Sequence, residues 1–271
     1  MLLFNLLKNS LKSGYLTVMV SKLLKRTEQD TSSEAIQWAK KNCILTEKFC
    51  KIIDENLWEE TLFEMNILKK DANKILSKIH VNLGGGGNYY LLYFLVRKVK
   101  PKIVVETGVA AGWSSLSILR AFQKSGFGKL YSSDFPYFRL NQPENYIGIV
   151  TKKEKNLLSW DLDVSGDRVA LPSIKSKVGR LKIDFFHYDS DKSYSGRSMA
   201  FNVLKGKLSK NAIIIFDDIQ NNMHFHDFVK NEHLPYNVLE FEGKFIGIAS
   251  KLDIMKPALI RFCNSNKNAF K

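Results

Sequence analysis

The sequence predicts an α/β fold: a doubly wound, mostly parallel sheet that ends in an antiparallel C-terminal hairpin and follows a helical N-terminal extension. From Pro101 onward, predicted strands such as "KIVVETG", "KLYSSD", "LKIDFFHYDS" and "NAIIIFDDI" alternate with helical patterns such as "SSLSILRAFQKSG". Repeated strand–helix units build parallel sheets. Two alternating runs in "YNVLEFEGKFIGIASK" flank Glu242, Gly243 and Lys244, which predicts the hairpin.

The composition indicates a folded protein in a reducing compartment. Of the 271 residues, 45% are hydrophobic, which is normal for a globular chain and excludes disorder as a whole. No apolar run reaches the roughly 18 residues that a membrane span needs. Three cysteines do not form a disulfide framework, and their odd number favours the cytoplasm. Cys43 and Cys50 share a helical pattern, which predicts packing on one helix face.

The chain is strongly basic. Its 41 Lys and Arg residues against 27 Asp and Glu give a net charge of +14, which favours anionic partners such as nucleic acid, a membrane surface or a phosphorylated substrate. The basic residues are spread along the chain and form no compact Arg-rich patch with aromatics. We therefore expect a Lys-rich surface without a dedicated partner, and no nucleic-acid partner.

Residues 1–80 predict helices. The first 26 residues carry five basic residues, no acid, and leucines at helical spacing. This segment could make a peripheral contact with an anionic membrane, or act as a transit peptide. We favour a helix that packs on the main domain or on the second subunit of a homodimer. Residues 33–80 are expected to continue as two or more amphipathic helices without a catalytic cluster.

Four consecutive glycines, residues 84–87, break this helical pattern. Such a run costs too much entropy to hold in a helix, so it predicts a loop that could cradle a ligand or link two domains. The expected division is a helical extension over residues 1–83, a main domain over 84–255 and a C-terminal tail over 256–271.

Acidic side chains follow the predicted strands, at the sheet edge where doubly wound folds bind their ligands. They are Glu106, Asp134, Asp189, Asp191, Asp217 and Asp218. Strand-end acids that merely cap turns are the alternative interpretation. Because the carboxyl ends of parallel strands meet at one edge, the acids are expected to converge there.

The segment "VVETGVAAGWSS" is the most informative motif. Gly108 and Gly112 stand in a strand-to-helix turn, where the backbone can approach a ligand and the helix offers free N–H groups. The acid Glu106 before the first glycine repels a pyrophosphate but suits an ammonium or sulfonium group. Ser114 and Ser115 offer hydroxyls to a ligand carboxylate at the helix start.

Two later acids extend this pattern. Asp134 ends the next strand, at a distance from Gly112 that suits a grip on ribose hydroxyls. Asp167, in "GDRVALP", stands where an adenine amino group could be met. For Asp134 the alternative is a carboxylate that caps the following turn.

These motifs together resemble the class I S-adenosylmethionine-dependent methyltransferases, and among them the bacterial macrocin-type small-molecule and sugar O-methyltransferases. The resemblance covers about residues 88–250 and rests on "ETGVAAGWSS", "LYSSD", "GDRVALP", "IDFFHYDSDKSY", "IIIFDDI" and "FIGIAS". It implies a seven-stranded, Rossmann-like sheet and S-adenosylmethionine as cofactor. The implied cofactor-binding residues are Glu106, Gly108, Gly112, Ser114, Ser115, Asp134, Asp167 and Asp189.

The resemblance also implies a cation site, because carboxylates that crowd one sheet edge need a cation or shared protons. The metal ligands aligned this way are Asp191, Asp217 and Asp218, with Mg²⁺ as the hard cation that suits oxygen ligands and Asp189 as a substitute nearer the cofactor. In such a site the metal lowers the pKa of the acceptor hydroxyl.

The predicted catalytic residues are Asp191, Lys192 and His224. Relatives often have His where Lys192 stands; an ammonium beside acids is a poor base, and it could instead replace the charge of a metal or bind an anionic substrate. His226 is a weaker candidate base, and His187 on its strand is expected to pack in the core. Aromatic residues that could line an acceptor pocket are Trp113, Tyr137, Phe138 and Phe225.

The sequence thus predicts methyl transfer from S-adenosylmethionine to a hydroxyl of a small molecule or sugar, with divalent metal assistance by Mg²⁺ as an option. Nucleic-acid methylation is an alternative, but the "N/D-P-P-Y/F" segment of base-amino methylators is missing and "DSDKSY" stands in its place. A catalytically inactive binding protein, in which Lys192 marks a lost base, is the other alternative.

Overall fold

The computed structural model describes residues 28–137, 140–152 and 159–253, with Asn5, residues 8–11 and Val18 ahead of them. Most of the predicted N-terminal helix and the tail over 256–271 lie outside the described residues, as does Phe138. No helix within the described part of the chain is long and apolar enough to cross a membrane.

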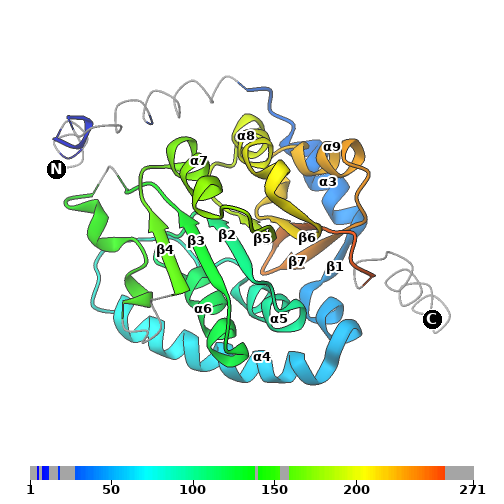
Figure 1. The fold of residues 1–271 in the computed structure, drawn as a ribbon, viewed down its shortest axis with the longest axis horizontal. Helices are drawn as coiled ribbons and strands as arrows, with labels where there is room; N and C mark the ends of the chain where they lie inside the picture. The colour runs from blue at the N-terminus through cyan, green and yellow to red at the C-terminus, as the bar shows by residue number, and fades with distance from the viewer. Residues whose placement is uncertain are drawn as a thin grey trace.

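A central sheet of eight strands has the order β1-β7-β8-β6-β5-β2-β3-β4 (Figure 1). The strands are β1 (Cys43–Leu45), β2 (Ile103–Thr107), β3 (Lys129–Ser133), β4 (Trp160–Asp163), β5 (Ile183–Tyr188), β6 (Leu208–Phe216), β7 (Tyr236–Phe241) and β8 (Lys244–Ala249). Only β8 runs antiparallel to its neighbours β6 and β7, so the predicted mostly parallel sheet with a C-terminal hairpin is confirmed.

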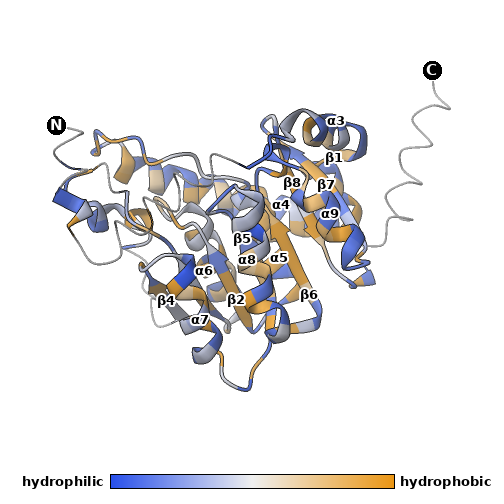
Figure 2. Ribbon diagram, turned by 90° about the horizontal axis from the view of Figure 1, so that it is seen from above, coloured by the Kyte–Doolittle hydropathy of each residue, from blue (hydrophilic) through white to orange (hydrophobic). Residues whose placement is uncertain are grey.

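Helices cover both faces of the sheet (Figure 1). One apolar core joins α4 (Thr46–Leu76), α5 (Tyr89–Val99) and α6 (Trp113–Ser125) to the sheet. The other joins α3 (Ser32–Asn42), α7 (Asp167–Lys177), α8 (Tyr194–Leu204) and α9 (His224–Asn231) to the opposite face. Figure 2 shows β2 and β6 as largely hydrophobic strands, as a sheet covered on both faces requires.

Short 3-10 helices connect these elements: η2 (Pro143–Tyr146), η3 (Ile149–Thr151), η5 (Lys205–Lys207) and η6 (Ile219–Asn221). The last of them, η6, is separated from the end of β6 by two residues, the predicted site acids Asp217 and Asp218. The fold therefore places irregular backbone at the carboxyl ends of the strands, where loops can present side chains to a ligand.

The eighth strand, β1, corrects the expectation that the sheet has seven strands and that residues 33–80 are helical throughout. Its three residues extend the sheet beyond β7, pairing Ile44 with Leu239 in parallel. Cys43 has extended backbone angles at the end of α3, and the apolar run Cys43-Ile44-Leu45 suits a strand that is partly buried at an edge. The two cysteines therefore do not share a helix face, since Cys50 lies in α4.

The segment before the glycine run contributes to the same core as the rest of the sheet. Phe49, Trp58, Met65 and Leu68 of α4 are buried in the cluster that also holds α5 and α6. Arg97 of α5 forms an ion pair with Glu60 of α4, with a distance of 3.1 Å. The division at residue 83 stays a prediction. Both β1 and α4 precede this residue, yet they pack in the same sheet and core as elements that follow it.

Candidate functional site

The loops after four parallel strands meet at one edge of the sheet. Backbone bonds continue the ladder beyond the strand ends: Gly108 N–H donates to Ser133 O (2.8 Å), Asp189 N–H to Thr107 O (3.0 Å) and Asp217 N–H to Tyr188 O (3.0 Å). The loops after β2, β5 and β6 therefore lie side by side. This is the edge at which the sequence predicts a site.

Gly108 makes the closest approach between two of these loops. Its φ is +81°, and a Cβ placed on it would lie 2.6 Å from the carbonyl carbon of Asp189 and 2.9 Å from the nitrogen of Ser190. No other residue type fits between these backbones without moving one of them. The glycine therefore sets the spacing between the β2 and β5 loops.

The remainder of the glycine turn leads into α6. Gly112 has a φ of +99° and precedes the helix without a side-chain cap. The first N–H groups of α6 are therefore available to a ligand carboxylate. Ala110 adopts a φ of +50°, so alanine is accommodated there in a left-handed conformation. Ser114 is buried in the first turn of α6.

Glu106 is turned into the protein rather than toward the loops. Its carboxylate is fully buried and accepts hydrogen bonds from Ser115 Oγ (2.5 Å) and Ser132 Oγ (2.8 Å). Its other oxygen lies 3.7 Å from Nδ1 of His187, and neither atom has a hydrogen-bond partner. Ser115 thus orients the carboxylate of Glu106, which lies in the protein interior below the glycine turn.

Asp134 connects β3 to the glycine turn. Its carboxylate accepts the N–H of Ala110 (2.7 Å) and the N–H of Phe135 (2.6 Å). Burial raises the pKa of Asp134 to about 6, despite these two bonds. The structure therefore places Asp134, the residue predicted to bind ribose, against the glycine turn, and its bond from Phe135 N–H is the turn cap of the alternative interpretation.

Asp167 lies at the start of α7 and faces the strand ends. It accepts a hydrogen bond from Ser133 Oγ (2.7 Å) and one from Ser190 Oγ. These bonds join α7 to the loops after β3 and β5. Its predicted contact with an adenine ring stays a prediction.

A cluster of charged side chains lies at the ends of β5 and β6. His187, Asp189 and Asp217 each place a potential ligand atom within 4.8 Å of the others. The Lys192 ammonium forms an ion pair with Asp189 and a second one with Asp218 at 3.1 Å. Lys244 reaches the other oxygen of Asp218 at 3.4 Å. Lysines therefore face the acids from two sides.

The cluster changes the protonation of its members. Burial raises the pKa of Asp217 to about 7, and the charge of Asp189 adds to this rise. Burial alone would lower the pKa of Lys192, but the three carboxylates outweigh it and the pKa is raised. Burial opposes ionisation of Asp218, yet the Lys192 and Lys244 ammonium groups hold its pKa below the usual value. Lys192 is thus a cation and not a base.

Two predicted catalytic residues lie apart from this cluster. Asp191 accepts the N–H of Ser193 (3.1 Å), and its carboxyl carbon would lie 2.6 Å from a Cβ at Gly196, so it packs against the first turn of α8. His224 is buried beside the rings of Tyr194 and Phe228. Within the described residues, Asp191, Asp217 and Asp218 do not form a group with metal-ligand spacing.

The glycine run passes over the acids. A Cβ on Gly87 would lie 3.1 Å from Oδ2 of Asp217 and 3.8 Å from Oδ2 of Asp189. Tyr137 Oη donates to the carbonyl of Leu83 (2.9 Å), and burial together with the charges of Asp134 and Asp189 raises the pKa of Tyr137 to about 12. The sequence allowed the glycine run either to cradle a ligand or to link two domains. In the structure this loop lies beside the candidate site.

The predicted pocket aromatics have different surroundings. Trp113 lies beside Tyr89, with ring centroids 5.2 Å apart, and a Cβ at Gly86 would be 3.1 Å from its Cγ. Phe225 is buried in the core on the other face, against Phe216. Tyr137 and Trp113 are therefore near the glycine run, and Phe225 has a packing role.

Arg197 is a residue that the sequence analysis did not single out. It is fully buried in α8, and Nη2 donates to the carbonyls of Asp217 (2.9 Å) and Asp218 (2.8 Å). It thereby fixes the turn that presents both acids. A signal was available, because Arg197 shares a helix face with the apolar residues Ala200 and Phe201, and a charge on a buried face needs partners.

The burial of His224 predicts how the stability of the protein depends on pH. Burial and the nearby Arg197 charge lower the pKa of His224 to about 3, whereas an unfolded histidine titrates near 6.5. Its contribution to stability is therefore present above about pH 6.5 and lost as the pH falls toward 3, on the order of a few kcal/mol in total. We expect His224→Phe, which keeps the ring packing, to flatten the loss of unfolding free energy between pH 7 and pH 4.

Urea unfolding across this pH range measures the effect. The matched control is His80→Phe, because His80 is exposed and should leave the acid sensitivity unchanged. An unaltered pH dependence in His224→Phe would show that His224 is protonated in the folded protein.

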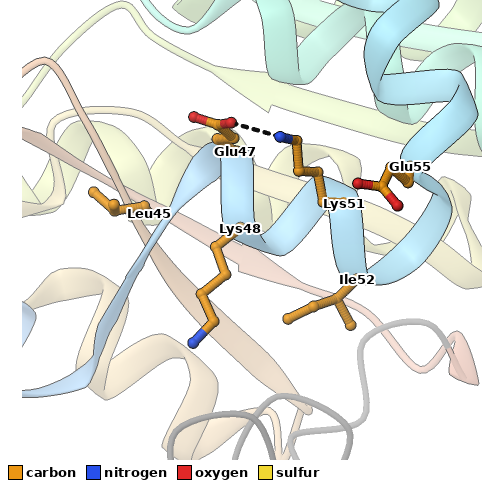
Figure 3. A pocket seen from close by; sticks show the side chains of 6 residues that line it. All are labelled: Leu45, Glu47, Lys48, Lys51, Ile52 and Glu55. Atoms are coloured by element: carbon orange, nitrogen blue, oxygen red, sulfur yellow. Dashed lines mark ion pairs between the residues drawn. The ribbon is translucent and has the colours of Figure 1, made fainter. Parts of the chain in front are cut away.

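Two hollows lie away from the strand-end edge. One, of about 360 Å³, is lined by Leu45 of β1 and by Glu47, Lys48, Lys51, Ile52 and Glu55 of α4 (Figure 3). Lys51 pairs with Glu47 across 2.9 Å, as the dashed line shows. The other, of about 130 Å³, lies between α8 and α9 and includes His224. His224 is the only predicted site residue that lines either of these two hollows.

Residues 105–219 match the family model described as a methyltransferase domain. This range begins in β2 and ends just after β6, so it includes the glycine turn and the acid cluster. The comparison with curated protein sequences finds no relative that matches.

Solved structures share the fold. The O-methyltransferase TomG from Streptomyces achromogenes, involved in tomaymycin synthesis and solved in complex with SAM, has a TM-score of 0.52 and 15% identity over 68% of this chain and 88% of that one. A methyltransferase from Geobacter sulfurreducens has a TM-score of 0.50 and 15% identity over 68% and 89%. The predicted Rossmann-like methyltransferase fold is confirmed, and the chain is similar to methyltransferases over residues 105–219; the macrocin-type resemblance stays a prediction.

Proposed function

We propose that this chain, whose residues 105–219 match a methyltransferase-domain model, transfers a methyl group from S-adenosylmethionine to a hydroxyl of a small molecule or sugar. The observation that carries the proposal is the junction of β2 and β3. There the uncapped start of α6 and the Asp134 carboxylate are held together by the hydrogen bond from Ala110. A free helix N-terminus suits a carboxylate, and an acid at the next strand end suits ribose hydroxyls.

The residues around this junction fit the cofactor. The N–H groups of α6 would bind the methionine carboxylate, and Gly108 and Gly112 keep side chains out of the turn. Asp134 would accept from a ribose hydroxyl with the lone pairs that Ala110 and Phe135 leave free. When bound, S-adenosylmethionine supplies an electrophilic methyl group on a sulfonium sulfur.

The chemical task of the protein is alignment and removal of the hydroxyl proton. Effective positioning of two reactants contributes about 7–11 kcal/mol to many such reactions. Asp217 would take the proton, because it is the buried carboxylate at the end of β6 beside the glycine run. Lys192 and Arg197 hold it in place through charge and through its backbone carbonyl.

The cofactor assignment predicts the effect of a substitution at Asp134. We expect Asp134→Ala to weaken binding of S-adenosylhomocysteine by about tenfold to a hundredfold, since hydrogen bonds to a charged group contribute about 1.5–3 kcal/mol each. The measurement is calorimetric titration of the full chain. Asp161→Ala is the matched control, because Asp161 lies within β4 and pairs with Lys177 at 2.8 Å.

Methyl transfer itself is tested with radiolabelled S-adenosylmethionine and a panel of diols, sugars and phenols. Label in an acceptor that depends on Asp217 would support the proposal. Binding of S-adenosylhomocysteine with no transfer to any acceptor would favour an inactive binding protein. A homodimer and a cytoplasmic location remain predictions, which sedimentation and fractionation can test.

A further inference from the structure

The acids at the ends of β5 and β6 already have a cation among them. Lys192 forms its ion pair with Asp189 and reaches Oδ2 of Asp218 at 3.1 Å. The ammonium is therefore the local positive charge that makes this group of acids tolerable.

The three residues aligned as Mg²⁺ ligands, Asp191, Asp217 and Asp218, do not fit a metal as a set. Asp191 accepts the N–H of Ser193 at the start of α8, and it does not join Asp217 and Asp218 in a group with ligand spacing among the described residues. Asp218 is engaged by Lys192 and by Lys244. A hard divalent cation needs several free oxygen ligands, and here two ammonium groups already occupy them.

We propose that the Lys192 ammonium takes the place of a divalent metal, so that this chain works without one. The inference rests on the proposed function for the role of the site, and on the ion pairs for the cation. A metal entering between the acids would meet a fixed positive charge on the same chain. Because that charge is covalently attached, it is not lost to a chelator or diluted away.

Three side chains near Lys192 have the spacing of metal ligands. One ring nitrogen of His187 and one oxygen each of Asp189 and Asp217 lie within 4.8 Å of one another. His187 is 4% exposed, and its Nδ1 has no hydrogen-bond partner. Imidazole and carboxylate together are ligands for Mn²⁺ and related ions. Removal of the lysine charge should therefore open this group to a divalent cation.

The test is titration of the full chain with Mn²⁺, followed by calorimetry. The wild-type protein should show no saturable binding that depends on Asp217. Lys192→Met, which keeps the length of the side chain, should show saturable Mn²⁺ binding, at least about tenfold tighter than any binding by Lys192→Arg, and the added substitution Asp217→Asn should abolish it. Lys192→Arg is the conservative control, because it keeps a cation and should be as indifferent to Mn²⁺ as the wild type.

Two results would overturn the inference. One is saturable Mn²⁺ binding by the wild-type chain that disappears in Asp217→Asn; this arm does not require that Lys192→Met folds. The other is a folded Lys192→Met protein, judged by circular dichroism, that binds Mn²⁺ no better than Lys192→Arg. Neither readout depends on methyl transfer, and failure of the proposed function would appear separately as absent S-adenosylhomocysteine binding.

Discussion

Gly108→Ala is expected to abolish cofactor binding and to destabilise the fold strongly. The new Cβ would lie 2.6 Å from the carbonyl carbon of Asp189, and the backbone φ of +81° is one that alanine rarely adopts. A left-handed conformation costs about 1–2 kcal/mol for a residue with a Cβ, and overpacking adds about 1–3 kcal/mol. Because both obstacles are backbone, no rotamer change can relieve them, and the β2 and β5 loops must separate.

Thermal or urea unfolding measures the loss of stability, and calorimetry with S-adenosylhomocysteine measures the loss of binding. Gly206→Ala is the matched control, since a Cβ there meets nothing within 4 Å. Gly108→Ala protein that unfolds and binds like Gly206→Ala would contradict the close contact between the two loops.

Asp217→Asn is expected to reduce methyl transfer by about 10²–10⁴-fold, the usual effect of losing a general base. The same substitution should not lower the free energy of unfolding. Burial raises the pKa of Asp217 to about 7, so the folded protein loses stability as the pH rises from about 4 to 7 and this carboxyl ionises. The neutral amide avoids that cost, and the variant should be as stable as the wild type or more stable above pH 7.

Rate and unfolding free energy therefore separate the catalytic role from a structural one. Asp161→Asn, on β4, serves as the control and should leave both quantities near their wild-type values. Unaltered methyl transfer in Asp217→Asn would show that another group takes the proton. A parallel loss of activity and stability would instead show that Asp217 mainly holds the turn after β6.

The sheet edge could be predicted from sequence because strand polarity alone decides it. Asp134, Asp189 and Asp217 each directly follow a predicted strand, and the carboxyl ends of parallel strands in one sheet lie at the same edge. The hairpin could likewise be predicted, since alternation around Glu242-Gly243-Lys244 is a local signal. Strand β1 could not, because three residues between two helices carry too little periodicity to be recognised.

The sequence could not predict where the side chains of the loops point. Asp191 stands only two residues after Asp189, yet the intervening turn directs it to the N–H of Ser193 and leaves the acid cluster. Lys192 was recognised as a departure, but its pairing with Asp189 and Asp218 depends on how β5 and β6 are spaced. Glu106 shows the same limit, because its serine partners come from β3 and α6.

The most direct measurement is calorimetric titration of the wild-type chain with S-adenosylhomocysteine, once in EDTA and once with Mg²⁺. We predict micromolar binding in both conditions, with the same affinity, because the cofactor contacts α6 and Asp134 and the acid cluster has its own ammonium. No binding heat in either condition would contradict the methyltransferase function.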